Sequence, residues 1–180
     1  MKYKRINRTL VKIIAYAVMA VVLFVMQTSL FSHLKLAGVV PNLLMILTAS
    51  AGIIGGCTDG SVTGFFCGIM ADLVFGHYLG TYGLIYLVCG YAAGIVNRIF
   101  YKEDITFPLF TIAILDLVYG LYMYFISLFT SRGSAEIFLF ALRRIILPEA
   151  AYTIIAAIFL YRFILYINGK IQRIGGEGLV

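Results

Sequence analysis

Six apolar stretches, separated by short polar segments, follow one another along almost the whole chain. They lie near residues 12–32, 41–55, 60–76, 81–98, 105–129 and 148–167. Apolar stretches of about 20 residues cross the hydrocarbon core of a bilayer as α-helices. The second and third are short, and seventeen residues of helix, about 26 Å long, just reach across. The pattern predicts an all-α polytopic membrane protein with six transmembrane helices.

The composition requires the same environment. Charged residues make up only 12% of the chain and hydrophobic residues 62%, whereas soluble domains are about 25% charged. So few charges cannot cover a water-exposed surface, so lipid must surround most of the molecule. No stretch is long and polar enough for a separate soluble domain, and no repeat of fixed period is present. We therefore expect a single integral membrane domain over residues 1–180.

The net charge of +6 is concentrated before the first apolar stretch, at Lys2, Lys4, Arg5, Arg8 and Lys12. This placement is typical of a membrane-orientation signal and of attraction to anionic lipid, rather than of nucleic-acid binding. If the N-terminus is cytoplasmic, ten of the fourteen Lys and Arg residues lie on that side and four outside. The four outer residues are Lys35, Arg132, Arg143 and Arg144. The excess predicts a cytoplasmic location for both termini.

The stretch GSVTGFFCGIMADLVFG, at 60–76, carries a small or acidic residue at every fourth position. These residues are Gly60, Gly64, Gly68, Asp72 and Gly76. Glycines at this spacing allow another helix backbone to approach closely. The approaching helix belongs either to the same chain or to a partner protein, and the need of a six-helix bundle to pack itself favours the same chain.

Gly90 and Gly94 form a second step of the same kind in the next apolar stretch. We expect this step to line a lipid-buried groove for the transmembrane helix of a partner.

Asp72 is an ionisable residue near the end of a predicted span, where a carboxylate opposes the helix dipole. The following helix begins near Thr81, and its first backbone N–H groups lack intrahelical partners. We expect Asp72 to accept hydrogen bonds from the 77–83 turn and so to clamp two helices together. The alternative is direct contact with a ligand or partner.

Asp116 lies near the middle of the fifth apolar stretch, where no Lys or Arg is predicted. Without a cation at that depth, we expect it to be protonated or bonded to a Tyr or Thr hydroxyl. The alternative is a place in a proton or substrate pathway, although a single acid does not make a proton relay.

Glu149 follows Pro148 at the predicted start of the last span. There the helix dipole favours a carboxylate, and Arg143 or Arg144 can pair with it. Residues 134–147 are predicted to form a short interfacial helix before this span, although a segment that dips partway into the membrane is the alternative.

Catalytic and cofactor-binding motifs are not found in the sequence. Cys57, Cys67 and Cys89 lie in or beside apolar stretches without metal-ligand spacing, and His33 and His77 stand alone. We predict that the chain has no catalytic residues, no cofactor and no metal.

Three segments, taken in order, resemble the MreD family of rod shape-determining proteins. They are PNLLMIL at 41–47, GFFCGIMADLVFGHYLGTYGL at 64–84 and LPEAAYTIIAAIFLYRFI at 147–164, and the resemblance covers residues 12–167.

The middle segment is the most specific of the three. Asp72, Gly76 and Gly80 match its pattern, and Pro41 matches the proline before the second span. Asn42 stands where the family often has Asp, so no charge is carried over to that position.

The resemblance implies a non-enzymatic scaffold in the bacterial cytoplasmic membrane, which binds MreC within the cell-elongation machinery. Through MreC it would be linked to MreB, to the RodA glycosyltransferase and to a penicillin-binding transpeptidase in peptidoglycan synthesis. The family fold is similar to that of the substrate-binding components of energy-coupling-factor vitamin transporters.

This similarity supplies the alternative that the chain is itself such a transporter component. Those proteins usually carry an Ala-x-x-x-Ala contact on the first helix. Ala15, Ala17 and Ala20 each lack an alanine four residues on, which counts against the alternative.

Overall fold

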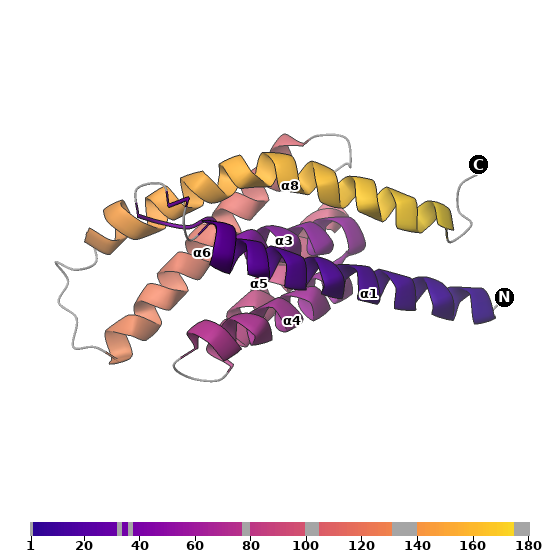
Figure 1. Ribbon diagram of the computed structural model, residues 1–180, viewed down its shortest axis with the longest axis horizontal. Helices are drawn as coiled ribbons and strands as arrows, with labels where there is room; N and C mark the ends of the chain where they lie inside the picture. Colours follow the sequence, from indigo (N-terminus) through magenta and orange to yellow (C-terminus); the bar gives the residue numbers. More distant parts are fainter. Residues whose placement is uncertain are drawn as a thin grey trace.

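The computed structural model describes residues 2–31, 34–35, 38–76, 80–99, 105–130 and 140–174. Regular secondary structure over these residues is entirely helical, as the sequence predicts (Figure 1). The α-helices are α1 (Lys2–Val25), α3 (Leu43–Gly55), α4 (Cys57–Phe75), α5 (Thr81–Ile99), α6 (Thr106–Thr130) and α8 (Leu147–Ile174). Two short π-helical segments, η1 (Met26–Leu30) and η2 (Leu142–Ile146), extend α1 and precede α8.

Within the described part of the chain, three helical stretches are long and apolar enough to cross a membrane. They are Leu10–Leu30, Thr106–Leu128 and Leu142–Ile171, and Leu43–Gly55 and Thr81–Val96 are shorter apolar helices. Each predicted span therefore corresponds to a helix. Among the described residues, however, only these three helical stretches have the length and composition of a membrane span.

Helix α3 forms the centre of the bundle. Every residue from Leu43 to Gly52 is buried, because the helix is apolar on all sides and the other helices surround it. Its 13 residues measure about 20 Å, less than the thickness of the hydrocarbon core. A helix this short leaves its ends inside the molecule, so its terminal backbone groups need protein partners.

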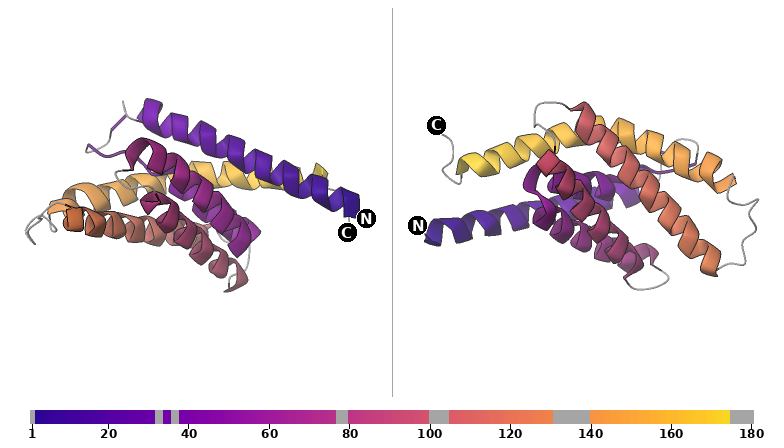
Figure 2. Two further views of the ribbon diagram at one scale, coloured as in Figure 1. Left: turned by 90° about the horizontal axis from the view of Figure 1, so that it is seen from below. Right: turned by 180° about the vertical axis from the view of Figure 1, so that it is seen from behind.

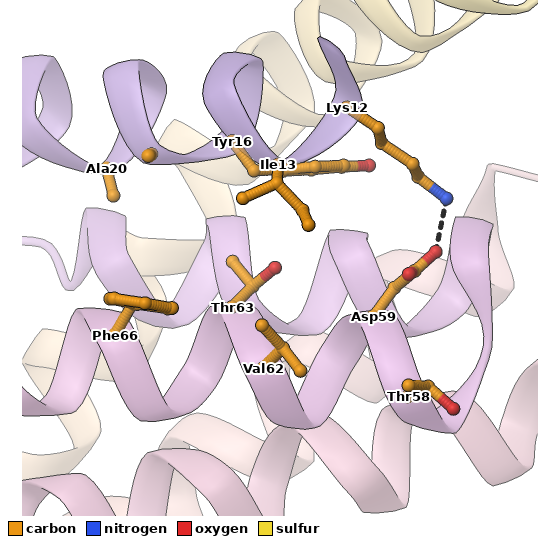
Figure 3. Close-up of a pocket in the computed structure, with 10 residues that line it drawn as sticks. Lys12, Ile13, Tyr16, Ala20, Thr58, Asp59, Val62, Thr63 and Phe66 are labelled. Atoms are coloured by element: carbon orange, nitrogen blue, oxygen red, sulfur yellow. Dashed lines mark hydrogen bonds and ion pairs between the residues drawn. The ribbon is translucent and has the colours of Figure 1, made fainter. Parts of the chain in front are cut away.

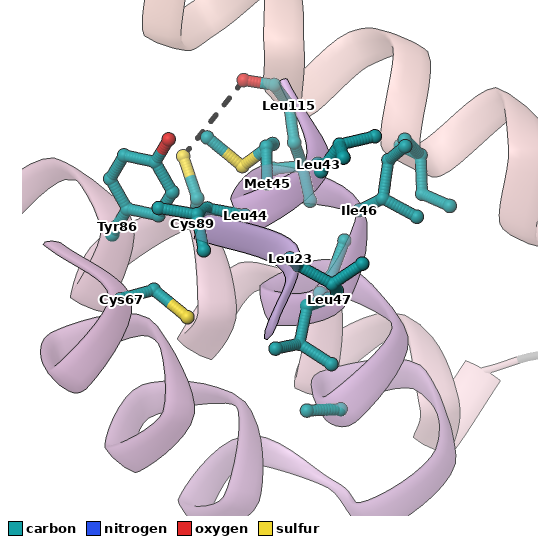
Figure 4. Packing of buried hydrophobic residues seen from close by; sticks show 14 of the residues in the cluster. Leu23, Leu43, Leu44, Met45, Ile46, Leu47, Cys67, Tyr86, Cys89 and Leu115 are labelled. Carbon is teal, nitrogen blue, oxygen red and sulfur yellow. Dashed lines mark hydrogen bonds between the residues drawn. The ribbon is translucent and has the colours of Figure 1, made fainter. Parts of the chain in front are cut away.

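The core closes around α3 with side chains from α4, α5 and α6. Figure 4 shows Leu43, Leu44 and Met45 packed near Tyr86 of α5, with Cys67 and Cys89 among them. All three cysteines are free, and Cys67 and Cys89 are fully buried among apolar side chains.

Helices α4 and α5 form the tightest pair, because glycines face each other along it. A Cβ atom on Gly60 would collide with the carbonyl oxygen of Gly90, and one on Gly68 would lie 2.5 Å from the Cα of Gly83. Gly64 meets the backbone of Tyr86 in the same way. The glycine stripe of 60–76 therefore contacts a helix of its own chain.

The groove expected at Gly90 and Gly94 is already filled. Gly90 contacts Gly60, and a Cβ atom on Gly94 would collide with the backbone of Cys57. Because α4 occupies this surface, a partner's helix has no room there, and that expectation is corrected.

The connection between α3 and α4 is a single residue, Gly56, with a φ of +88° that favours glycine. The gap between the stretches predicted near 41–55 and 60–76 is thus mostly helical, and Asp59 and Gly60 lie within α4.

The last helix begins earlier than predicted. Phe140 and Ala141 are helical and lead through η2 directly into α8, which places Pro148 inside a continuous helix. A π-helical turn widens the backbone next to the proline. Residues 140–147 are therefore not a separate interfacial helix, and residues 134–139 of that prediction lie outside the described part of the chain.

Candidate functional site

Asp72 holds the end of α4 to the start of α5. Its Oδ2 accepts hydrogen bonds from the backbone N–H groups of Gly80 (3.1 Å) and Gly83 (2.8 Å), and its Oδ1 accepts one from Tyr82 (3.0 Å). The side chain is only 4% exposed. These are the contacts with the following turn that the sequence predicts for this carboxylate.

Two glycines give this clamp its shape. Gly80 has a φ of +98°, which brings its N–H toward the carboxylate at little conformational cost. Gly76 ends α4 by donating its N–H to the backbone oxygen of Asp72 (3.0 Å). Asp72 therefore uses both side chain and backbone to close the hairpin.

A second set of polar contacts surrounds the start of α3. Asn42, buried after the buried Pro41, is the N-cap, and its Oδ1 accepts from the Met45 N–H (3.1 Å) and the Tyr86 hydroxyl (2.7 Å). Its own backbone N–H donates to Thr153 Oγ1 of α8 (3.1 Å). One asparagine thus joins α3 to α5 and α8.

Gln27 of η1 completes this cap, although it is not among the site residues predicted from the sequence. Its Oε1 accepts hydrogen bonds from the N–H groups of Leu43 (3.0 Å) and Leu44 (3.3 Å). The available signal was an amide side chain inside an otherwise apolar span, where a polar group needs a partner. Three of the first N–H groups of α3 are therefore satisfied by side chains from α1 and from α3's own cap.

Asp116 of α6 lies beside this capped helix start. It is 3% exposed, and neither carboxyl oxygen has a partner in hydrogen-bonding geometry among the described residues. The Thr153 hydroxyl and the Asn42 amide are its interacting polar neighbours. Thr153 is one of the hydroxyls with which the sequence could pair this acid, and the N-terminus of α3 adds a favourable dipole.

Glu149 is half-buried on α8, one turn before Thr153, and interacts electrostatically with Asp116. Glu149 lies in the first turn of α8, but helical backbone runs from Phe140 through η2 into α8 without a break. Glu149 therefore does not lie at the free end of a helix, and the expected dipole argument is wrong. Among the described residues no ion pair joins it to Arg143 or Arg144, both of which are exposed.

Tyrosine rings fill the space between α5 and α6 beside these acids. Tyr119 contacts Tyr86 at 5.5 Å and Tyr82 at 6.3 Å between ring centroids. In the described part of the chain no group of three or more His, Cys, Asp or Glu side chains could hold a metal ion. The polar side chains mainly join helix ends, a task that is structural rather than catalytic.

The sites predicted from sequence therefore fall into separate groups. Asp72, Gly76 and Gly80 meet at the α4–α5 turn, and Pro41, Asp116 and Glu149 gather near the start of α3. The remaining glycines lie between α4 and α5.

Comparison with known proteins gives one match. The family model described as rod shape-determining protein MreD matches residues 7–168 of the 180-residue chain. No curated protein and no solved structure matches the chain significantly. The matched region contains both groups of buried polar contacts and all of α3, α4, α5 and α6.

Proposed function

This chain belongs to the MreD family of rod shape-determining proteins, and from that premise we propose that it is a non-enzymatic membrane scaffold in bacterial cell elongation. The family implies a part in determining rod shape. The finer proposal is that the chain binds MreC in the cytoplasmic membrane, and through it serves MreB, RodA and a penicillin-binding transpeptidase during peptidoglycan synthesis.

The observation that carries the proposal is the family match over residues 7–168. The hydrogen bonds that the buried polar side chains make also support the scaffold proposal. Asp72, Asn42 and Gln27 each accept backbone N–H groups at helix ends, which makes the bundle rigid without presenting reactive groups to a substrate. A rigid helical body suits a protein whose task is to hold others in place.

A partner's transmembrane helix would dock on the outside of the bundle, because the glycine-lined contact is used internally. Helix α6 offers an exposed apolar stripe at helical spacing. Its residues are Phe110, Ile114, Val118, Leu121 and Phe125. We propose the outer faces of α6 and α8 as the regions to test first for contact with the single helix of a partner.

The test is affinity purification of the tagged chain from its native membrane in mild detergent, with mass spectrometry of the retained proteins. A tagged six-span protein of unrelated function is the control. Retention of MreC together with peptidoglycan synthases supports the scaffold. Retention of a transporter ATPase module and a vitamin would contradict it and support the transporter alternative.

A photo-crosslinking amino acid at Phe110, Phe125 or Phe159 locates the contact. All three side chains are exposed, at 64%, 55% and 76%. We expect an adduct with MreC from at least one of these positions and none from a buried control position such as Ile112. If MreC co-purifies but no outer position crosslinks, the scaffold function stands and the assignment of the docking face is wrong.

A further inference from the structure

A cavity of about 190 Å³ lies between α1 and α4. Figure 3 shows Ile13, Tyr16 and Ala20 of α1 facing Val62, Thr63 and Phe66 of α4 across it. The Lys12–Asp59 ion pair marks one end. Farther along both helices the rings of Phe24 and Phe75 touch, with centroids 6.2 Å apart. The two helices thus meet on both sides of the cavity and leave a space between them.

The size of the space limits what can occupy it. One turn of α-helix with its side chains takes up roughly 400 Å³, since the helix is about 10 Å across and rises about 5.4 Å per turn. A partner's helix therefore does not fit. An apolar cavity of about 150 Å³ holds a molecule the size of benzene, so a segment of a flexible hydrocarbon chain does fit.

Two hydrogen-bond donors are available at the ion-pair end. Tyr16 is only 6% exposed, its hydroxyl points toward Lys12, and it has no hydrogen-bond partner among the described residues. A buried hydroxyl without a partner is unfavourable. The Lys12 ammonium has three N–H donors and gives one to Asp59, which leaves donors for a second acceptor.

The charge at this end favours an anion. Lys12 is the last of five cationic residues in the first twelve, and Asp59 is the one acidic residue that lines the cavity. Anionic phospholipids attract such juxtamembrane cationic clusters. A phosphate beside Lys12 and an ester oxygen beside Tyr16, one helical turn deeper, match the order of groups along a phospholipid.

From these observations we propose that the cavity between α1 and α4 binds a segment of one acyl chain of an anionic phospholipid. Lys12 contacts the phosphate, the Tyr16 hydroxyl donates to an ester oxygen, and the chain lies along Ala20, Val62 and Phe66. The lipid belongs to the leaflet on the side of the N-terminus. This inference does not depend on the proposed scaffold function, because it concerns the chain alone.

The test is native mass spectrometry of the purified chain with phosphatidylglycerol or phosphatidylcholine added at matched concentrations. We expect one phosphatidylglycerol per chain, retained about tenfold better than phosphatidylcholine, as one charge-assisted hydrogen bond would give. Val62→Phe fills the cavity and should abolish retention of both lipids. Val74→Phe, the same change at an exposed site on the same helix, should leave retention unchanged.

Charge variants separate the headgroup contact from the ion pair. Lys12→Gln and Asp59→Asn both remove the ion pair, but only Lys12→Gln should remove the preference for phosphatidylglycerol. Ala17→Leu, at an exposed lining position, repeats the cavity test if Val62→Phe does not fold. Equal retention in the filled-cavity and Val74→Phe variants, or no preference between the lipids in the unmodified chain, would overturn the proposal.

Discussion

A carboxylate inside an apolar helix is stable only where hydrogen-bond donors replace the water it has lost. Asp72 meets this condition with three backbone N–H groups, from Gly80 and from the first turn of α5. Asp116 meets it less completely, since neither of its carboxyl oxygens has a partner in hydrogen-bonding geometry among the described residues, although the Thr153 hydroxyl and the Asn42 amide lie beside it. The two acids therefore serve different ends of the bundle, and Asp72 is the more strongly held.

Asp72→Asn should lower the free energy of unfolding by about 1.5–3 kcal/mol, the range for hydrogen bonds to a charged group. The amide retains one acceptor oxygen but turns an NH₂ group toward a backbone donor. Thermal unfolding in detergent, followed by circular dichroism because the chain has no Trp, measures the change.

Asp59→Asn is the control for that substitution. It is the same change on the same helix, at a half-exposed ion pair with Lys12, and should cost less than about 1 kcal/mol. Equal losses in the two variants would mean that the Asp72 hydrogen bonds do not hold the hairpin.

Gln27→Leu should destabilise the bundle by about 1–3 kcal/mol, because it removes the side-chain acceptor of two buried N–H groups. Leu43 would keep only its contact with the Pro41 carbonyl oxygen, and Leu44 would lose the acceptor that Gln27 provides. Gln27→Glu retains an acceptor at the same position and should cost less. The order of the two melting temperatures tests the cap, and a Gln27→Leu variant as stable as Gln27→Glu contradicts it.

Sequence separation explains which of these contacts could be foreseen. The donors to Asp72 lie 8–11 residues further along the chain, so the turn alone brings them together. The contacts of Asn42 with Tyr86 and Thr153 span 44 and 111 residues. Such pairings depend on how the helices pack, which the pattern of apolar stretches does not specify.

At the scale of the elements, the positions and lengths of the apolar stretches predict the helices well but predict their connections poorly. The stretches near 81–98 and 105–129 correspond closely to α5 and α6. The predicted start near residue 148 agrees with α8, but its continuity with η2 was not predicted, because proline is common at the first position of a helix, whereas here Pro148 lies within a continuous one. A π-helical turn leaves no clear mark in the spacing of apolar residues.

Because α4 and α5 pack so closely, even a substitution that adds a single methyl group to this contact should destabilise the chain. Gly60→Ala should destabilise the chain by about 1–3 kcal/mol or more, because the added methyl group meets the carbonyl oxygen of Gly90 and pushes the backbones apart. Gly169→Ala on α8, where nothing lies within 4 Å, should be neutral or slightly stabilising.

Accumulation in the membrane and thermal unfolding in detergent measure both glycine variants. Gly90→Leu should likewise reduce the amount of folded chain, rather than release a partner from an intact bundle. If Gly90→Leu folds normally but no longer binds its partner, Gly90 contacts the partner, and the assignment of this surface to α4 alone is wrong.

At the scale of the whole molecule, the bundle surrounds the first ten residues of α3. Because Pro41, Asn42 and Leu43–Gly52 are all buried, the non-helical backbone before α3 lies within protein. Irregular backbone at membrane depth is tolerated only in such a place. The N-terminal end of α1 and the C-terminal end of α8 lie at the same end of the molecule, as Figures 1 and 2 show.

This arrangement, with the excess of Lys and Arg at that end, predicts that both termini are cytoplasmic. Lys35→Cys, beyond the C-terminal end of η1, and Lys170→Cys, near the C-terminal end of α8, place a thiol at exposed positions. The C-terminal ends of these two elements lie at opposite ends of the molecule (Figure 1). In a Cys57→Ser background, with Cys67 and Cys89 buried, a membrane-impermeant maleimide added to spheroplasts should label only Lys35→Cys. Both should react after the membrane is opened, and labelling of Lys170→Cys in sealed spheroplasts would mean that the orientation is reversed or mixed.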